Sequence, residues 1–169
     1  MTHVVFELSR EPRPCLEYGH LKSAVEAVAA SDTLTPALIR KVIIKIRKEK
    51  LPEPSVMGSA GSFFKNPVIS FEHFQRIESA AKAEHGADYK VPHYDLPDGV
   101  KVPAAWMIEQ CGWKGRRSGG AAVYEKQPLV IVNYTGEAYP EEIIGLERRI
   151  IASVNDKFGV ELHPEVDHI

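Results

Sequence analysis

A ten-residue stretch from Gly58 to Pro67 brings together side chains that could do chemistry. It holds a hydroxyl at Ser62, an ammonium at Lys65, an amide at Asn66, two aromatic rings and two glycines. Burying such polar groups in a structural core costs free energy unless each finds a partner. A ligand site, by contrast, needs a few convergent polar groups held on a rigid apolar base. We therefore interpret this stretch as the functional site.

A second stretch, Gly112 to Gly120, is rich in glycine and cationic residues. Its lysine, Lys114, precedes most of the glycines and no predicted strand leads into them, so the stretch does not resemble a P-loop or a GxGxxG turn. Guanidinium groups and backbone N–H donors nevertheless both suit phosphate. The backbone N–H groups of this stretch and the guanidinium groups of Arg116 and Arg117 therefore predict an anion site.

The composition limits the class of protein. The chain has 169 residues, of which 44% are hydrophobic and 26% charged, which is enough for one good core. A formal net charge of -2 gives no electrostatic reason to expect nucleic acid as a partner. No stretch approaches the length of a membrane span, and the N-terminus lacks the regions of a signal peptide, so we expect a cytoplasmic protein.

Metal binding is not predicted. Cys15 and Cys111 lie far apart without a CxxC or Cys/His spacing, which is typical of free thiols in a reducing compartment. The seven histidines show no ligand spacing apart from the loose pair His163 and His168, which we interpret as surface residues.

The elements that must position these groups follow from hydrophobic spacing and end signals. Hydroxyl caps, prolines at first helical positions and terminal glycines predict helices over 21–30, 36–48, 71–85, 103–111 and 140–158. Residues 121–133 predict a hairpin whose second strand is central, residues 3–8 predict a strand, and 87–99 a loop. The fold class is therefore α+β, a small mixed sheet packed by helices.

Four motifs occur in an order that resembles one family, the UDP-N-acetylenolpyruvoylglucosamine reductases, in its C-terminal part. They are Gly58-x-Ala60-Gly61-Ser62-Phe63-Phe64-Lys65-Asn66-Pro67, Trp106-x-Ile108-Glu109-Gln110-Cys111-x-x-Lys114-Gly115, Gln127-x-Leu129-Val130-Ile131-Val132-Asn133 and Phe158-Gly159-Val160-x-Leu162-x-Pro164-Glu165. With the Lys50-Leu51-Pro52 segment and the Cys15-to-Gly19 arm, the resemblance covers nearly the whole chain.

The resemblance implies an NADPH- and FAD-dependent reduction of UDP-N-acetylenolpyruvoylglucosamine to UDP-N-acetylmuramate in peptidoglycan synthesis. It makes Ser62 the proton donor and Glu165 a carboxylate that assists it. It assigns substrate binding to four further residues, Lys50, Asn66, Lys114 and Gln127. Because the motifs match only the C-terminal part, we expect no bound cofactor and no activity in this chain without an N-terminal FAD-binding region.

The same resemblance predicts three parts. Residues 1–34 would be the end of the FAD-binding region with a connecting arm, and 35–159 the substrate-binding C-terminal domain. Residues 160–169 would be a tail that returns toward the FAD-binding region.

Other interpretations remain. The chain could be a flavin-free module that binds nucleotide sugars, or an unrelated α+β protein in which the motifs are structural. Ser62 could merely cap a loop, Glu165 could be an ordinary tail carboxylate, and Lys50 and Lys114 could be solvated charges. Proton donation by Ser62 needs help from Lys65, from Asn66 or from an electron-rich intermediate.

Overall fold

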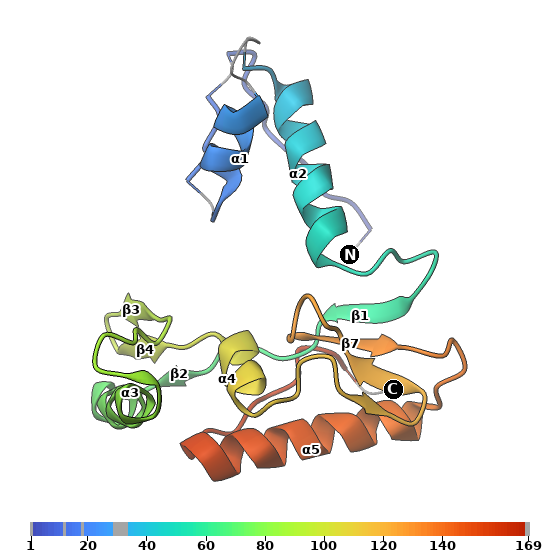
Figure 1. Cartoon of the computed structure of the whole chain (residues 1–169). Coiled ribbons are helices and arrows are strands. Elements are labelled where there is room, and N and C mark those ends of the chain that lie inside the picture. The colour runs from blue at the N-terminus through green and yellow to red at the C-terminus, as the bar shows by residue number, and fades with distance from the viewer. Residues whose placement is uncertain (1, 12, 18, 29–33, 168–169) are drawn as a thin grey trace. The chain divides into compact units, whose positions relative to one another are not determined.

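The computed structural model describes residues 2–11, 13–17, 19–28 and 34–167. It divides into two compact units, Met1–Lys50 and Leu51–Ile169 (Figure 1). This division falls after the second helix. The functional boundaries at residues 34 and 159 stay predictions.

The first unit is a pair of helices, α1 (Leu21–Val28) and α2 (Pro36–Lys50), that pack against each other. Thr35 caps α2 as predicted, because its Oγ1 accepts the N–H of Leu38 at 3.2 Å. Helix α2 continues two residues beyond the predicted end. The last two residues of the first predicted helix, 29 and 30, lie outside the described residues.

The predicted strand over residues 3–8 is not formed. Val5 and Phe6 are 94% and 76% exposed, and no described segment pairs with this stretch. A strand needs a neighbour to take up its backbone N–H and C=O groups, so a β-prone sequence alone does not make one.

The second unit is organised on a four-stranded antiparallel sheet in the order β1 (Gly58–Ser62), β7 (Val130–Asn133), β6 (Ala121–Val123) and β5 (Arg117–Ser118). Helix α5 (Pro140–Phe158) runs along one face of this sheet (Figure 1). It packs Leu146, Ile150 and Val154 in one core with side chains of β6 and β7. Strand β7 has a partner on each side, which confirms the predicted hairpin and its central strand.

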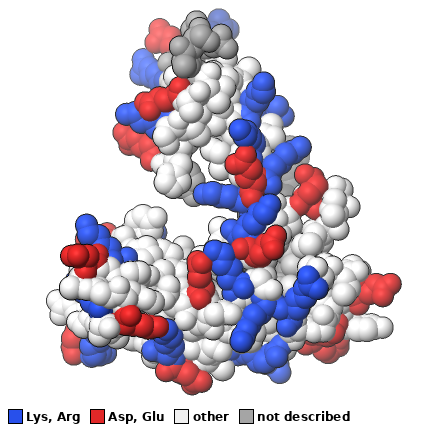
Figure 2. Space-filling model, in the orientation of Figure 1, with Lys and Arg blue, Asp and Glu red and all other residues white. Residues whose placement is uncertain are grey.

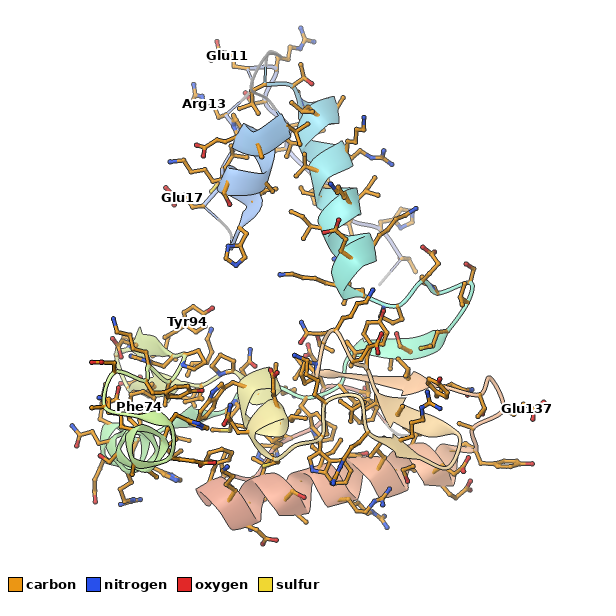
Figure 3. The ribbon with its side chains drawn as sticks, in the orientation of Figure 1. Glu11, Arg13, Glu17, Phe74, Tyr94 and Glu137 are labelled. Carbon is orange, nitrogen blue, oxygen red and sulfur yellow. The ribbon has the colours of Figure 1, made fainter. Side chains whose placement is uncertain are left out.

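A smaller sheet, in the order β2 (Val68–Ile69), β4 (Gly99–Lys101) and β3 (Tyr94–Leu96), carries helix α3 (Phe71–His85). Phe74 points from α3 into the protein and is buried, whereas Tyr94 projects outward and is exposed (Figure 3). The predicted loop over 87–99 was wrong in its last part, because β3 and the start of β4 lie there. The polar, proline-rich sequence did not predict the pairing of β3 with β4, to which β2 adds a third strand.

Helix α3 begins and ends where predicted. Ser70 Oγ accepts the N–H of His73 at 3.1 Å, and the N–H of Gly86 donates to Lys82 O at the other end. The short helix α4 (Ala104–Gln110) connects the two sheets and buries Met107 and Ile108.

The N-terminus of α5 is tied to the turn between β5 and β6 through Glu142. Its carboxylate accepts the N–H of Gly120 at 3.0 Å and the N–H of Tyr139 at 2.9 Å. A Cβ on Gly120 would lie 2.8 Å from Ala138 Cα, so only glycine allows the turn to approach this closely. The two hydrogen bonds, that of Gly120 foremost, lower the pKa of Glu142 below its ordinary 4.5.

Because the pKa of Glu142 is lowered, the stabilisation by its two hydrogen bonds has a predictable pH dependence. The ionised carboxylate stabilises the fold above its ordinary pKa, and the contribution is lost as the pH falls through the lowered value. We expect Glu142→Gln to be less stable than the wild type at pH 7, with a difference that shrinks as the solution is acidified.

The measurement is urea unfolding between pH 7 and 3, followed by fluorescence of Trp106 and Trp113, which both lie in the second unit. Glu141→Gln is the matched control, because Glu141 is exposed in the same helical turn. A stability difference for Glu142→Gln that stays constant with pH would contradict a stabilising role of the ionised Glu142 carboxylate.

Candidate functional site

Ser62 ends strand β1 at an irregular place in the sheet. The pairing with β7 shifts between Ser59 and Ser62, and Gly61 between them has a φ of +79°, which favours glycine. The first part of the Gly58-to-Pro67 stretch is therefore a strand with a bulge, and Ser62 is exposed on it. Bulges re-aim side chains, so the backbone here sets the direction of the hydroxyl.

Two buried rings follow immediately and anchor the serine. Phe63 and Phe64 are 3% and 1% exposed, and their ring centroids lie 5.3 Å apart. The N–H of Phe63 donates to Leu129 O at 2.8 Å, which joins this segment to the start of β7. These rings are the rigid apolar base that a polar site needs.

The C-terminal tail pairs with the other side of the same segment. The N–H of Glu165 donates to Phe63 O and that of Lys65 donates to His163 O, each at 2.9 Å. Phe64 and Pro164 form a bridge between these two bonds. The structure thus brings the segments of Ser62 and Glu165 side by side, although they are far apart in sequence. The Glu165 side chain is exposed.

Asn66 has a structural role that the sequence did not reveal. Its Oδ1 accepts the N–H of Ala104 at 2.9 Å, at the first turn of α4, where Pro103 offers no side-chain cap. The N–H of Val102 donates to Pro67 O at 3.0 Å beside it. The carbonyl oxygen is thus used by the protein, whereas the NH₂ can donate to a ligand.

Lys114 and Gln127 lie in two turns that approach each other. A Cβ on Gly115, next to Lys114, would lie 3.7 Å from Glu125 Cβ in the turn that also carries Gln127. This second turn leads through Leu129 to the Phe63 contact. Lys114 Nζ is paired with Glu109 Oε1 at 2.6 Å, and both side chains are nearly half exposed.

Glu109 is a residue that sequence analysis missed. It lies in the same motif as Lys114, but its pairing depends on α4 ending at Gln110, which periodicity predicts only to within a residue or two. Lys50, the remaining predicted residue, is exposed at the C-terminal end of α2 in the first unit.

Among the described residues there is no group of three or more His, Cys, Asp or Glu that could hold a metal ion. Cys111 Sγ contacts Ser153 O at 3.4 Å, and burial raises the pKa of this thiol more than the nearby Lys157 lowers it. No helix of the described residues is long and apolar enough to cross a membrane.

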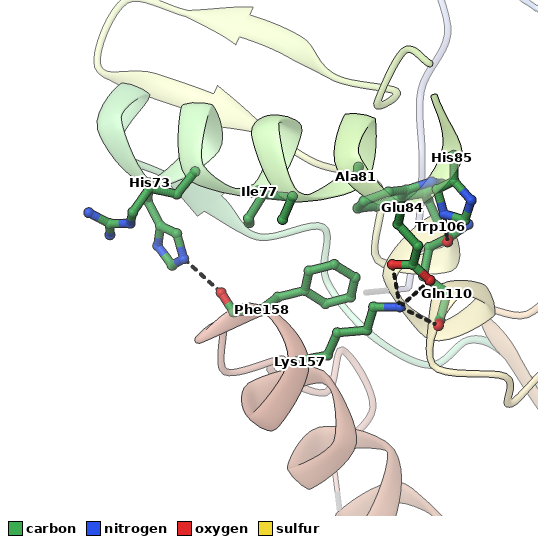
Figure 4. A pocket seen from close by; sticks show the side chains of 11 residues that line it. His73, Ile77, Ala81, Glu84, His85, Trp106, Gln110, Lys157 and Phe158 are labelled. Atoms are coloured by element: carbon green, nitrogen blue, oxygen red, sulfur yellow. Dashed lines mark hydrogen bonds and ion pairs between the residues drawn. The ribbon is translucent and has the colours of Figure 1, made fainter. Parts of the chain in front are cut away.

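A cavity of about 260 Å³ lies elsewhere, between α3, α4 and the end of α5 (Figure 4). Its polar groups bind one another across it. Lys157 Nζ lies 3.2 Å from both Glu84 and Gln110 O, and His73 Nε2 lies 2.7 Å from Phe158 O. Because these contacts join the three helices, we interpret the cavity as a gap in the packing between them and not as a ligand site.

Comparison with known proteins shows which family the chain resembles and how much of its relatives' length it spans. Residues 53–169 match the model of a family described as UDP-N-acetylenolpyruvoylglucosamine reductase, C-terminal domain. A protein named UDP-N-acetylenolpyruvoylglucosamine reductase from Bacteroides fragilis is 44% identical over 171 residues, covering 100% of this chain and 48% of its own length.

Proteins of the same name from Porphyromonas gingivalis and Pseudomonas syringae are each 45% identical. They cover 99% and 96% of this chain, and 47% and 45% of their own lengths respectively. The chain therefore spans about half the length of the curated relatives it matches.

The cap on α4 predicts how Asn66 variants behave. Asn66→Ala removes the acceptor for the Ala104 N–H and should cost about 1 kcal/mol of unfolding free energy. Asn66→Asp keeps an acceptor oxygen and should retain most of that stability while losing the NH₂ donor. The measurement is denaturant unfolding of both variants, and equal stability of Asn66→Ala and wild type would contradict the cap.

Proposed function

Because the chain belongs to the family of UDP-N-acetylenolpyruvoylglucosamine reductase C-terminal domains, we propose that it is the substrate-binding part of a reductase for UDP-N-acetylenolpyruvoylglucosamine. The product would be UDP-N-acetylmuramate, a precursor for peptidoglycan and hence for cell-wall growth and division, made in the cytoplasm. The observation that carries the proposal is the backbone pairing that sets the Ser62 and Glu165 segments side by side on a buried base.

The proposed reaction adds a hydride to the methylene carbon of the enolpyruvyl group and a proton to the carbon that bears the ether oxygen. FAD, reduced by NADPH, supplies the hydride when bound. In this proposal the described residues form one wall of the site, on which Ser62 and Glu165 are both exposed. Because the chain spans about half the length of its curated relatives, we assign the cofactors to another region of the longer protein.

Ser62 is the proton donor in this proposal. When the π electrons move toward the substrate carboxylate, the ether-bearing carbon becomes basic and takes the proton of the Ser62 hydroxyl. Asn66 Oδ1 holds α4, so Lys65, the NH₂ of Asn66 or the electron-rich intermediate would favour the transfer. Glu165 assists the developing acid from the neighbouring backbone segment.

The remaining predicted residues would bind the substrate. Lys50 and Lys114 suit the diphosphate, whereas the NH₂ of Asn66 and the amide of Gln127 suit phosphate or sugar oxygens. The exposed pair of Lys114 with Glu109 does not oppose this, because such pairs contribute only about 0–1 kcal/mol and a diphosphate can displace the carboxylate.

Replacing the hydroxyl tests the proposed reaction. In the longer protein, Ser62→Ala should lower kcat by about 10²-fold or more, because a positioned proton donor contributes that much. Reduction of the flavin by NADPH should be unchanged, since it needs no proton from Ser62. Stopped-flow absorbance of the flavin separates the two half-reactions.

Ser59→Ala is the matched control, because Ser59 is exposed on the same strand. Normal reoxidation of the flavin in Ser62→Ala would exclude Ser62 as the donor. Binding of the UDP-sugar with no turnover in the wild-type longer protein would favour the flavin-free binding module instead.

The pair of Lys114 with Glu109 gives a test of substrate binding. Lys114→Gln should raise the Kd for the UDP-sugar by about tenfold, the loss of one charge-assisted contact. Glu109→Gln should lower the Kd, because the lysine is then released. Calorimetric titration of the longer protein checks both, and a weaker affinity in Glu109→Gln would contradict the assignment.

A further inference from the structure

The ring of Trp113 is a platform for two guanidinium groups. It is 7% exposed, in the turn that follows α4. The Cζ of Arg116, from the same turn, lies 5.4 Å from the ring centroid, and the Cζ of Arg149, from α5, lies 5.6 Å from it. Both distances are in the range of a cation–π contact. Two elements therefore hold two cations on one buried ring.

A hydroxyl completes this cluster. Arg149 Nη2 donates to Ser118 Oγ, and Ser118 is half-buried on β5. A serine that accepts one hydrogen bond still has its own O–H to donate. The cluster thus offers two guanidinium groups and a hydroxyl from three elements, and the fold holds them in place before any ligand binds.

Within the part of the chain that the structure describes, the arginines of the cluster have no ion-pair partner. Each ion pair among the described residues joins other partners, and none includes Arg116, Arg117 or Arg149. Figure 2 shows several Lys and Arg side chains near one another on the face of the second unit that carries α5. The guanidinium groups of Arg116 and Arg149 both lie within 5.6 Å of the same ring centroid, and an anion bound by both would lower their mutual repulsion.

The two neighbouring cations are used elsewhere. Lys114 is paired with Glu109, and Arg117 lies over the Tyr134 ring with its Cζ 3.6 Å from the centroid. Arg117 and Tyr134 line a separate cavity of about 250 Å³ on the side of Met57 and Tyr124. The cluster is therefore limited to Trp113, Arg116, Ser118 and Arg149.

We propose that this cluster is a binding site for the phosphate group of a small soluble molecule. Guanidinium groups donate pairs of N–H groups in a plane that matches phosphate oxygens. Arg116 and Arg149 would each bind phosphate oxygens, and Ser118 would donate its O–H. The site goes beyond the proposed reductase function, because none of its four side chains is assigned a part there.

The test is an NMR titration of the 169-residue chain with pyrophosphate and, separately, with inorganic phosphate. We expect saturable shifts of the Trp113 indole N–H and of the amides of Arg116 and Ser118. Arg149→Gln and Arg116→Gln should each weaken binding by about tenfold or more, the equivalent of about 1.4 kcal/mol. The Trp106 indole signal reports whether each variant is folded.

Arg148→Gln is the matched control, because it removes the same charge from the next residue of α5 and Arg148 lines a different surface with Ala152 and Asn155. It should change the affinity by less than about twofold, the effect of a screened distant charge. Arg149→Lys keeps the charge but loses the planar guanidinium with its paired N–H donors. Its affinity for pyrophosphate should lie between those of the wild type and Arg149→Gln.

Three outcomes would overturn the proposal. The first is a lack of saturable binding. The second is an equal loss of affinity in Arg148→Gln, which would indicate general charge attraction. The third is binding to phosphatidylglycerol vesicles without binding to pyrophosphate. A preference for pyrophosphate over inorganic phosphate would support it and assign a diphosphate as the ligand.

Discussion

The backbone hydrogen bonds of Phe63 are the constraint on which the candidate site depends. Its N–H reaches Leu129 at the start of β7, and its C=O accepts from Glu165 in the tail. One residue thus joins the sheet to the tail, while its ring and that of Phe64 are buried beneath the exposed groups. Moving either ring out would expose apolar area worth about 1.5–3 kcal/mol, so the polar groups around them are held firmly.

Short elements elsewhere in the second unit are joined by single side chains that bind backbone N–H groups. Glu142 ties the β5–β6 turn to α5, and Asn66 ties the Ser62 segment to α4. Each partner would otherwise leave an unpaired N–H at a helix start or a tight turn. Polar residues near a site can therefore maintain its geometry and contact a ligand at once, as we propose for Asn66.

Local signals predicted the long elements well, because their caps and apolar spacing lie within the segment itself. Helices α3 and α5 end just before Gly86 and Gly159, which cap them, as expected. Strand β1 could not be predicted, because Gly58–Ser62 has low β-propensity and becomes a strand only through its pairing with β7. Residues 3–8, by contrast, have high β-propensity but form no strand, because no described segment pairs with them.

The site shows the same division between local and distant information. The motif around Ser62 and the position of Glu165 were evident from their resemblance to a family, but the backbone pairing that joins them was not. The contacts of Asn66 with Ala104 and of Arg149 with Trp113 join residues far apart in sequence. Their partners are set by tertiary packing, which no spacing rule describes.

The pairing of the Ser62 segment with the tail also bears on how the molecule folds. A contact between residues 63 and 165 closes a loop on the order of 100 residues, and such non-local contacts are slow to form. The hairpin β6–β7 and helix α5 lie within that loop and can form first from local contacts. We infer that the tail docks last, after the segments between residues 63 and 165 have folded.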